Sequence, residues 1–272
     1  MGDDIMTLSP PSPDARIAYG LDAEQFGELW LPEGYGRYPV VALLHGGYWR
    51  ARHGLAYMGH IAHALRSEGV VVWNIEYRRL GQAGGGWPGT LLDVARAMDF
   101  LRDLARKYPL DVTRVVVAGH SAGGHLAAWV AGRHRLPPGN PLYNENPLPV
   151  RGVVSLAGVL DLRLAWERRL SDAVVLDFLG GDPLAYPERY AAASPATLVP
   201  LGVPQAIIHG TSDESVPYEV SERYWQAACA AGDDAELITL PGVGHFALVD
   251  PRTPEWVCVR AEIMRLLNPA HD

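Results

Sequence analysis

A serine lies between two glycines where a valine-rich segment meets a helical pattern. Residues 113–118 are expected to form a buried strand, a G-H-S-A-G stretch centred on Ser121 follows, and residues 122–133 have a helical pattern. A strand that passes directly into a helix through G-x-S-x-G is the context of a nucleophile elbow. Because the turn is tight, its flanking positions must be small, as Gly119 and Gly123 are. The alternative is a Gly-Ser loop that only caps a helix, and the strand before the turn favours the elbow.

Strands and helices alternate over most of the chain. Several apolar segments are continuous rather than alternating with polar residues, which is typical of parallel strands covered on both faces. The expected strands are residues 27–31, 38–44, 70–77, 113–118, 151–156, 205–209 and 235–240. The expected helices are residues 54–68, 89–108, 122–133, 217–231 and 254–267. This alternation predicts an α/β fold with a mostly parallel, doubly wound sheet of about eight strands, whose early strands form an antiparallel edge.

The 272 residues, 48% of them hydrophobic, suffice for one large core. Residues 1–14 are rich in Asp and Pro and are expected to be a disordered tail. Residues 15–272 are expected to form a single domain, because no linker divides them. Within it, residues 161–195 are predicted to form a small cap over the C-terminal edge of the sheet.

Charge and composition limit the partners. The net charge of -8 argues against a nucleic-acid surface, which would be basic. No apolar run is long enough to cross a bilayer, and the N-terminus lacks the pattern of a signal peptide, so a cytoplasmic protein is expected. Two cysteines cannot form a disulfide framework, and no metal or organic cofactor is expected. The expected partner is a small-molecule substrate, and the question of a homodimer stays open.

A serine is a weak nucleophile until a base accepts its proton. In folds with a G-x-S-x-G elbow of this type, the serine acts in a catalytic triad. Its acid and its histidine follow the serine along the chain, in that order. His245 fits the base, because it lies in a glycine-flanked loop just after the last expected strand, residues 235–240. Asp213 follows the preceding strand and fits the acid that orients this histidine. Glu214 is its neighbour and competitor, and Asp161 is the topological alternative.

Other histidines receive different expectations. His120 and His125 flank the serine, and local geometry is expected to turn them away from its hydroxyl. His209 lies within a strand and is expected to pack or to orient a loop. His60 and His63 have a spacing that metal ligands can use, but without a third ligand nearby they are interpreted as surface residues.

The sequence H-G-G-Y-W at residues 45–49 follows a buried strand. Acyl transfer develops negative charge on a carbonyl oxygen, which backbone N–H groups must stabilise. One donor is expected from Ala122, and the others from Gly47 and Tyr48, because glycines allow this loop to turn its N–H groups inward. His45 is expected to brace the loop. A glycine turn followed by two core aromatics is the alternative for this segment alone.

These motifs resemble those of the α/β-hydrolase superfamily over residues 16–267. More narrowly, H-G-G-Y-W together with G-H-S-A-G-G-H-L resembles kynurenine formamidase (arylformamidase) and its bacterial esterase relatives. Residues 209–217 are also similar to prolyl-oligopeptidase-type peptidases, but no propeller precedes them. The formamidase resemblance implies hydrolysis of N-formyl-L-kynurenine in tryptophan catabolism, with Tyr48 and Trp49 forming part of a pocket for an aromatic substrate.

The sequence therefore predicts a serine hydrolase with Ser121, Asp213 and His245 as its triad and an acyl-enzyme intermediate. The substrate is predicted to be a small aryl formamide or ester, with N-formylkynurenine as the first candidate. The alternative is a carboxylesterase of the acetyl- or feruloyl-esterase type. Two further alternatives are a peptidase and a protein with a hydrolase fold that only binds a ligand.

Overall fold

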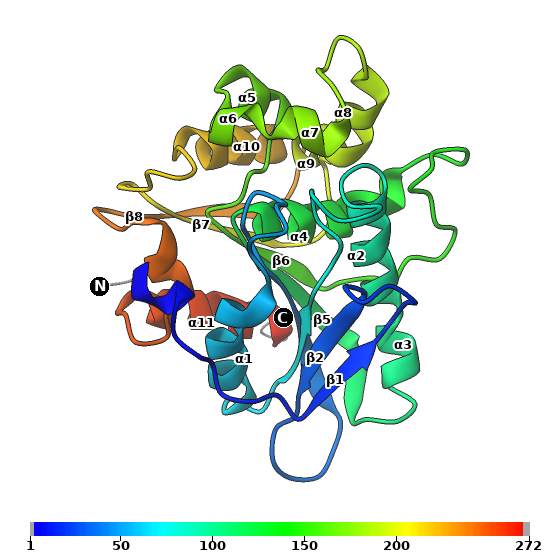
Figure 1. Cartoon of the computed structure of the whole chain (residues 1–272). Helices are drawn as coiled ribbons and strands as arrows, with labels where there is room; N and C mark the ends of the chain where they lie inside the picture. The colour runs from blue at the N-terminus through cyan, green and yellow to red at the C-terminus, as the bar shows by residue number, and fades with distance from the viewer. Residues whose placement is uncertain (1–2, 269–272) are drawn as a thin grey trace.

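An eight-stranded sheet with the order β1-β2-β4-β3-β5-β6-β7-β8 runs through the molecule (Figure 1). The computed structural model describes residues 3–268. The strands are β1 (Ala15–Ala18), β2 (Phe26–Trp30), β3 (Tyr38–Leu44), β4 (Val71–Ile75), β5 (Leu110–His120), β6 (Gly152–Leu156), β7 (Gln205–Gly210) and β8 (Ala235–Leu240). The β1–β2 and β2–β4 pairs are antiparallel and the other pairs are parallel. The predicted sheet with its antiparallel edge is confirmed.

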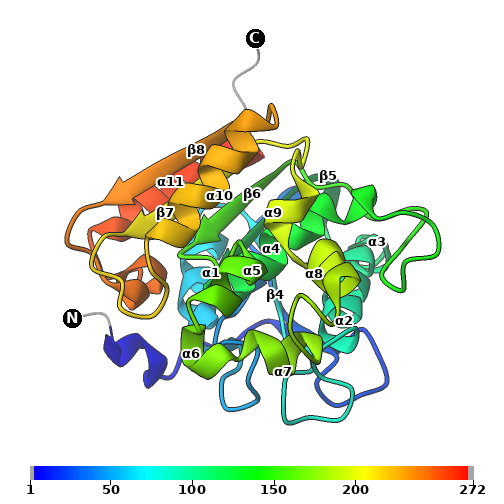
Figure 2. The ribbon, with the colours of Figure 1, turned by 90° about the horizontal axis from the view of Figure 1, so that it is seen from above.

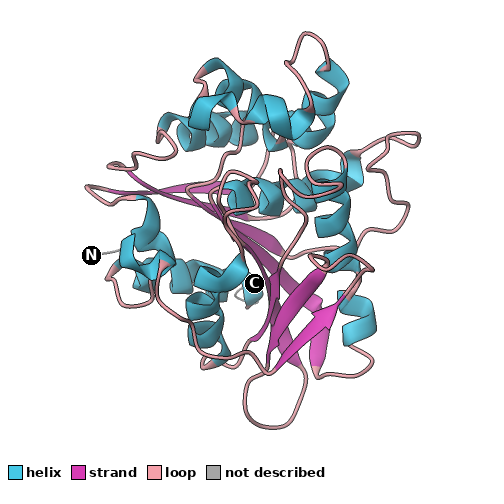
Figure 3. Ribbon diagram, viewed as in Figure 1, coloured by secondary structure: helices cyan, strands magenta, loops and turns pink. Residues whose placement is uncertain are grey.

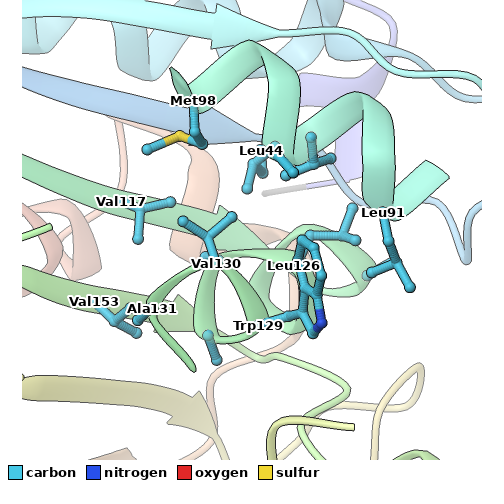
Figure 4. Packing of buried hydrophobic residues seen from close by; sticks show 14 of the residues in the cluster. Leu44, Leu91, Met98, Val117, Leu126, Trp129, Val130, Ala131 and Val153 are labelled. Atoms are coloured by element: carbon cyan, nitrogen blue, oxygen red, sulfur yellow. The ribbon is translucent and has the colours of Figure 1, made fainter. Parts of the chain in front are cut away.

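Successive residues of the central strands face opposite sides of the sheet. In β5, Val115 and Val117 belong to one hydrophobic cluster, whereas Val116 and Ala118 belong to the other. Both faces must therefore be apolar, which explains the continuous hydrophobic runs in the sequence. In the first cluster, Trp129 and other residues of α4 (Ala122–Gly132) pack close to the sheet (Figure 4).

Helices cover both faces of the sheet (Figures 2 and 3). Buried residues of α2 (Gly89–Asp99), α3 (Leu101–Leu104), α4 and α10 (Glu219–Ala230) join the first cluster. Those of α1 (Gly59–Arg66) and α11 (Glu255–Leu267) join the second. Short 3-10 helices are η1 (Asp3–Met6), η2 (Leu55–Met58), η3 (Arg133–Arg135) and η4 (His245–Val249). Among residues 3–268, no helix is long and apolar enough to cross a membrane.

The segment between β6 and β7 is helical. It contains α5 (Leu162–Glu167), α6 (Leu170–Ala173), α7 (Val175–Leu179), α8 (Pro187–Ala193) and α9 (Pro195–Leu198). In Figure 1 these helices lie above α4, on the same side of the sheet. Two main-chain groups hold them there, since the carbonyl oxygens of Ala192 and Ala193 accept hydrogen bonds from Trp129 and His125 of α4.

The N-terminal segment differs from its expectation. Its described part, residues 3–14, is not a free tail, because η1 packs against the body of the protein and Ile5 is fully buried. Ile5 belongs to the same hydrophobic cluster as Tyr57 and Met58. Asp and Pro content suggested disorder, but the buried Ile5, an ion pair between Asp4 and Arg252 and a 2.7 Å hydrogen bond from the Leu31 N–H to Asp14 attach the segment. Residues 1–2 of the expected tail lie outside the described residues.

Candidate active site

The turn between β5 and α4 holds Ser121 in a strained conformation. Its φ of 57° and ψ of -120° are unusual for a residue with a side chain, and such a backbone costs about 1–3 kcal/mol. The conformation is fixed by a 2.8 Å hydrogen bond from the Ser121 N–H to the carbonyl of Leu156. A Cβ atom at Gly119 would lie 2.1 Å from the Gly123 carbonyl oxygen, and one at Gly123 would lie 2.0 Å from that of Leu44. Both glycines are therefore required by space, as the elbow motif predicts.

His245 and Asp213 meet at the adjacent ends of the neighbouring strands. His245 Nδ1 lies 2.6 Å from Asp213 Oδ2, and the Asp213 side chain is fully buried. The other carboxylate oxygen accepts 2.8 Å hydrogen bonds from the N–H groups of Ser215 and Val216. These bonds leave His245 Nδ1 as a donor to the acid, so that its other ring nitrogen is available as a base.

His209 supports the same carboxylate from a second side. Its Nε2 lies 3.2 Å from Asp213 Oδ2, and its Nδ1 lies 2.6 Å from the hydroxyl of Ser221. Burial alone would raise the pKa of Asp213, but hydrogen bonds from His209 and His245 outweigh it and hold this pKa well below its usual range. Asp213 is therefore a carboxylate throughout the neutral pH range. His209 was expected to pack or to orient a loop, and the residue that it orients is Asp213.

Ser121 and His245 line one cavity of about 230 Å³. The other lining residues come from several segments: Met6, Gly47, Tyr48, Arg52, His53, Tyr57, His120, Ser171, Ser215 and Phe246. Within residues 3–268, the Ser121 hydroxyl has no hydrogen-bond partner, whereas His245 is bonded to Asp213 through Nδ1. The cavity brings a serine hydroxyl, a histidine ring and the residues of the loop after β3 around one small volume.

The loop after β3 offers backbone donors to this cavity. Gly47, Tyr48 and Trp49 have φ angles of 108°, 50° and 55°, which turn the chain sharply. The N–H of Gly46 is already engaged, because it donates a 2.6 Å hydrogen bond to the Tyr57 hydroxyl. Among the described residues, the N–H groups of Gly47 and Tyr48 have no acceptor in the protein. They and the first helical N–H, that of Ala122, are the candidate donors to an anion that the sequence predicts.

Trp49 does not line the cavity, which corrects the expectation of an aromatic pocket wall. Its side chain is only 1% exposed. The indole stacks on Phe178 of α7 with a centroid distance of 4.3 Å, and its N–H donates to His125. The positive φ of Trp49 directs its ring into the core beneath the helices between β6 and β7. Tyr48 does line the cavity, and its hydroxyl donates to the Ser215 carbonyl.

A buried chain of hydrogen bonds connects the loop, the elbow and the base. His120 Nε2 lies 3.1 Å from the carbonyl oxygen of His245, and its Nδ1 lies 2.9 Å from the Tyr57 hydroxyl. Burial and the neighbouring His245 hold the pKa of His120 well below its usual range, so its ring is neutral. A carbonyl only accepts, so Nε2 carries the proton and Nδ1 accepts from Tyr57. Tyr57 in turn accepts from the N–H of Gly46. The donor and the acceptor of each hydrogen bond in this series are therefore defined.

A second buried pair holds the same loop from behind. His45 Nε2 lies 2.7 Å from Glu76 Oε1, and its Nδ1 lies 2.8 Å from the carbonyl oxygen of Gly46. The ring stacks on Tyr77, whose hydroxyl donates to the His45 carbonyl. Burial would raise the pKa of Glu76, but His45 and Arg79 bring it below its usual value. His45 braces the loop, as expected from the sequence, and Glu76 is its partner.

Replacing Tyr57 with Phe is expected to lower kcat for ester hydrolysis by about 10-fold to 100-fold, with a small change in KM. The change leaves the Gly46 N–H and His120 Nδ1 without partners and loosens the donors of the neighbouring loop, one of which is worth about 10²- to 10³-fold in kcat. The matched control is Tyr224→Phe, since this buried hydroxyl bonds Gln205 away from the cavity. If steady-state kinetics showed equal losses of kcat in the two variants, Tyr57 would have no specific role in positioning the loop donors.

The remaining candidates from the sequence have structural roles. Asp161 caps α5, because its Oδ1 accepts hydrogen bonds from the N–H groups of Arg163 and Leu164. Glu214 is exposed and makes no hydrogen bond to His245. Sequence reasoning missed Tyr57 and Glu76, which lie in segments with no motif of their own. Within residues 3–268, no group of three or more His, Cys, Asp or Glu side chains is arranged to hold a metal ion.

Comparison with known proteins identifies relatives of this chain. The BD-FAE family profile matches residues 28–227. Esterase LipC of Mycobacterium tuberculosis is 31% identical over 253 residues, and the alignment covers 86% of this chain and 60% of LipC. Carboxylesterase NlhH of the same species is 29% identical over 243 residues, covering 83% of this chain and 73% of NlhH. The chain thus spans about three fifths of the length of LipC.

Solved structures share the fold. Esterase B from Lactobacillus rhamnosis superimposes with a TM-score of 0.81 at 21% identity, covering 97% of this chain and 89% of that protein. A truncated carbohydrate esterase from gut microbiota gives a TM-score of 0.79 at 24% identity, covering 96% and 99% of the two chains. At these identities the likeness establishes the architecture, which is that of the α/β-hydrolases.

Proposed function

Because the chain belongs to the BD-FAE family and has the α/β-hydrolase fold, we propose that it is a serine carboxylesterase acting on small esters. The observation that carries the proposal is the convergence of Ser121, the His245–Asp213 pair and unengaged N–H groups on one cavity. Similarity to esterase LipC and to carboxylesterase NlhH is the second supporting observation.

In the proposed mechanism, His245 accepts the proton of the Ser121 hydroxyl as Oγ attacks the ester carbonyl. The carbonyl oxygen becomes an anion held by the N–H groups of Gly47, Tyr48 and Ala122. The C–O bond then breaks, the leaving alcohol takes the proton from His245, and the acyl group stays on Ser121 Oγ. Water attacks this acyl-enzyme with His245 again as base, and the free acid leaves with Ser121 regenerated.

The structure favours the carboxylesterase alternative over the formamidase reading. The formamidase resemblance, carried by H-G-G-Y-W and G-H-S-A-G-G-H-L, implies that Trp49 forms part of an aromatic pocket, but Trp49 is buried against Phe178. The cavity of about 230 Å³ lies below the usual range of about 300–1,000 Å³ for ligand pockets, which suits a short acyl ester. The named relatives support the same choice.

Kinetics with two substrate classes test this proposal. We expect kcat/KM for p-nitrophenyl acetate and butyrate to exceed that for N-formyl-L-kynurenine by at least about 100-fold, a difference of about 2.7 kcal/mol. Formamide hydrolysis as efficient as ester hydrolysis would restore the formamidase reading. Turnover of neither class, with folded protein, would contradict a carboxylesterase.

A further inference from the structure

A residue of the N-terminal segment forms part of the catalytic cavity. Met6, the last residue of η1, lines the same cavity as Ser121 and His245. It is partly buried and packs against the second hydrophobic cluster, which also includes Tyr57. Its side chain is long, flexible and apolar, so it occupies space in the cavity without offering chemistry. Nothing in the triad mechanism uses it.

The segment that carries Met6 is attached on both sides. Ile5 is fully buried in the cluster that contains Tyr57 and Met58. Asp4 Oδ1 lies 2.8 Å from an Arg252 guanidinium nitrogen, and Arg252 is also paired with Asp250 at 2.6 Å. The two attachments hold η1 against η4, the helix that begins at His245, and Figure 1 shows the N-terminal segment beside it. The backbone that carries Met6 is therefore held in place, and the Met6 side chain forms part of the cavity wall.

A larger groove adjoins the catalytic cavity. It has a volume of about 580 Å³, and its lining includes Asp4, Phe246 and Arg252. Phe246 also lines the catalytic cavity, so the two spaces share this residue. Asp4 faces the groove and Met6 faces the cavity, only two residues apart in η1. The N-terminal segment therefore borders both a small catalytic space and a larger one.

The chemistry of the leaving group shows which part of a substrate meets this wall. The leaving oxygen must face His245, which protonates it, so the alcohol portion extends past His245 and toward the next residue, Phe246. Met6 and Phe246 both line this cavity and pack against the same hydrophobic cluster, and η1, which ends at Met6, contacts η4, which holds His245 and Phe246. On the basis of the proposed esterase function, we propose that Met6 is a specificity-determining residue that limits the size of the alcohol of the ester. Small alcohols fit, and long ones collide with Met6 before they reach the groove.

A series of alkyl acetates tests this inference, with proton release followed at constant pH. Methyl, butyl and hexyl acetate vary only the alcohol, whereas p-nitrophenyl acetate, butyrate and hexanoate vary only the acyl chain. We expect Met6→Ala to raise the hexyl-to-methyl ratio of kcat/KM by about 10-fold, and Met6→Trp to lower the butyl-to-methyl ratio similarly. The matched control is Leu8→Ala, because Leu8 is exposed, belongs to the same segment and lines neither space.

The outcomes separate this inference from the proposed function. Ester hydrolysis by the wild type with alcohol ratios unchanged in both Met6 variants would overturn the inference and leave the esterase standing. A change confined to the acyl series would also overturn it, since Met6 would then face the acyl side. Absence of any ester hydrolysis by the wild type would remove the proposed function and this inference with it.

Discussion

Replacing Ser121 with Ala is expected to lower kcat for p-nitrophenyl butyrate by about 10⁶-fold, because the hydroxyl proposed as the nucleophile is removed. The variant should fold, since the Ser121 side chain makes no hydrogen bond within residues 3–268 and its N–H still donates to Leu156. Alanine is under the same strain as serine at a φ of 57°. The loss of kcat would therefore reflect loss of the catalytic group and not loss of folding. Steady-state kinetics measure the activity, and circular dichroism measures the folding.

The matched control is Ser155→Ala. Ser155 lies on the neighbouring strand β6, is fully buried, and its hydroxyl has no hydrogen-bond partner among the described residues. This variant should keep kcat within about threefold of the wild type, because it removes no group from the cavity. Retention of more than about 1% of wild-type activity by Ser121→Ala would contradict the assignment of the nucleophile.

Replacing Asp213 with Asn is expected to lower kcat by about 10⁴-fold while leaving KM nearly unchanged. The carboxylate accepts from His245 Nδ1 at 2.6 Å, which fixes the tautomer that leaves Nε2 free to act as base. An amide at this position can present an N–H to the imidazole and stabilise the opposite tautomer. It also removes the negative charge that stabilises the imidazolium during proton transfer.

Two variants at the rejected positions are the controls for Asp213. Asp161→Asn keeps a side-chain oxygen that can cap α5, and Glu214→Gln changes an exposed side chain. Both should retain kcat within about threefold, because neither carboxylate contacts His245. A loss in Asp161→Asn that equals the loss in Asp213→Asn would return the acid to the alternative position after β6.

Local sequence patterns predicted the parts of the site that depend on the order of elements. The elbow at Ser121 is recognisable because a strand, a tight turn and a helix follow one another directly. Asp213 and His245 could be chosen because each follows a strand at the same edge of the parallel sheet, so that their loops meet. The strand β1 was missed, since a short edge strand with partly exposed side chains has little hydrophobic signal.

Contacts between distant segments were beyond sequence reasoning. Tyr48 and Trp49 of H-G-G-Y-W were expected to form one pocket wall. In the structure, the Tyr48 side chain lines the cavity and the Trp49 side chain lies in the core, and both residues have positive φ angles. Tyr57 acquires its role only because folding brings it to Gly46 and His120. For the N-terminal segment, the average composition of 14 residues is polar. That average gives no sign that one of its apolar side chains, Ile5, is buried and anchors the segment.

Labelling with a fluorophosphonate, followed by mass spectrometry of the digested protein, tests whether Ser121 is an activated nucleophile. The reagent phosphonylates an activated serine and leaves a mass increment on the modified peptide. We expect one labelled peptide, containing Ser121, with loss of esterase activity in proportion to labelling and no labelling of Ser121→Ala. An unlabelled wild-type protein would show that the cavity only binds a ligand, and a label at another serine would contradict the site itself.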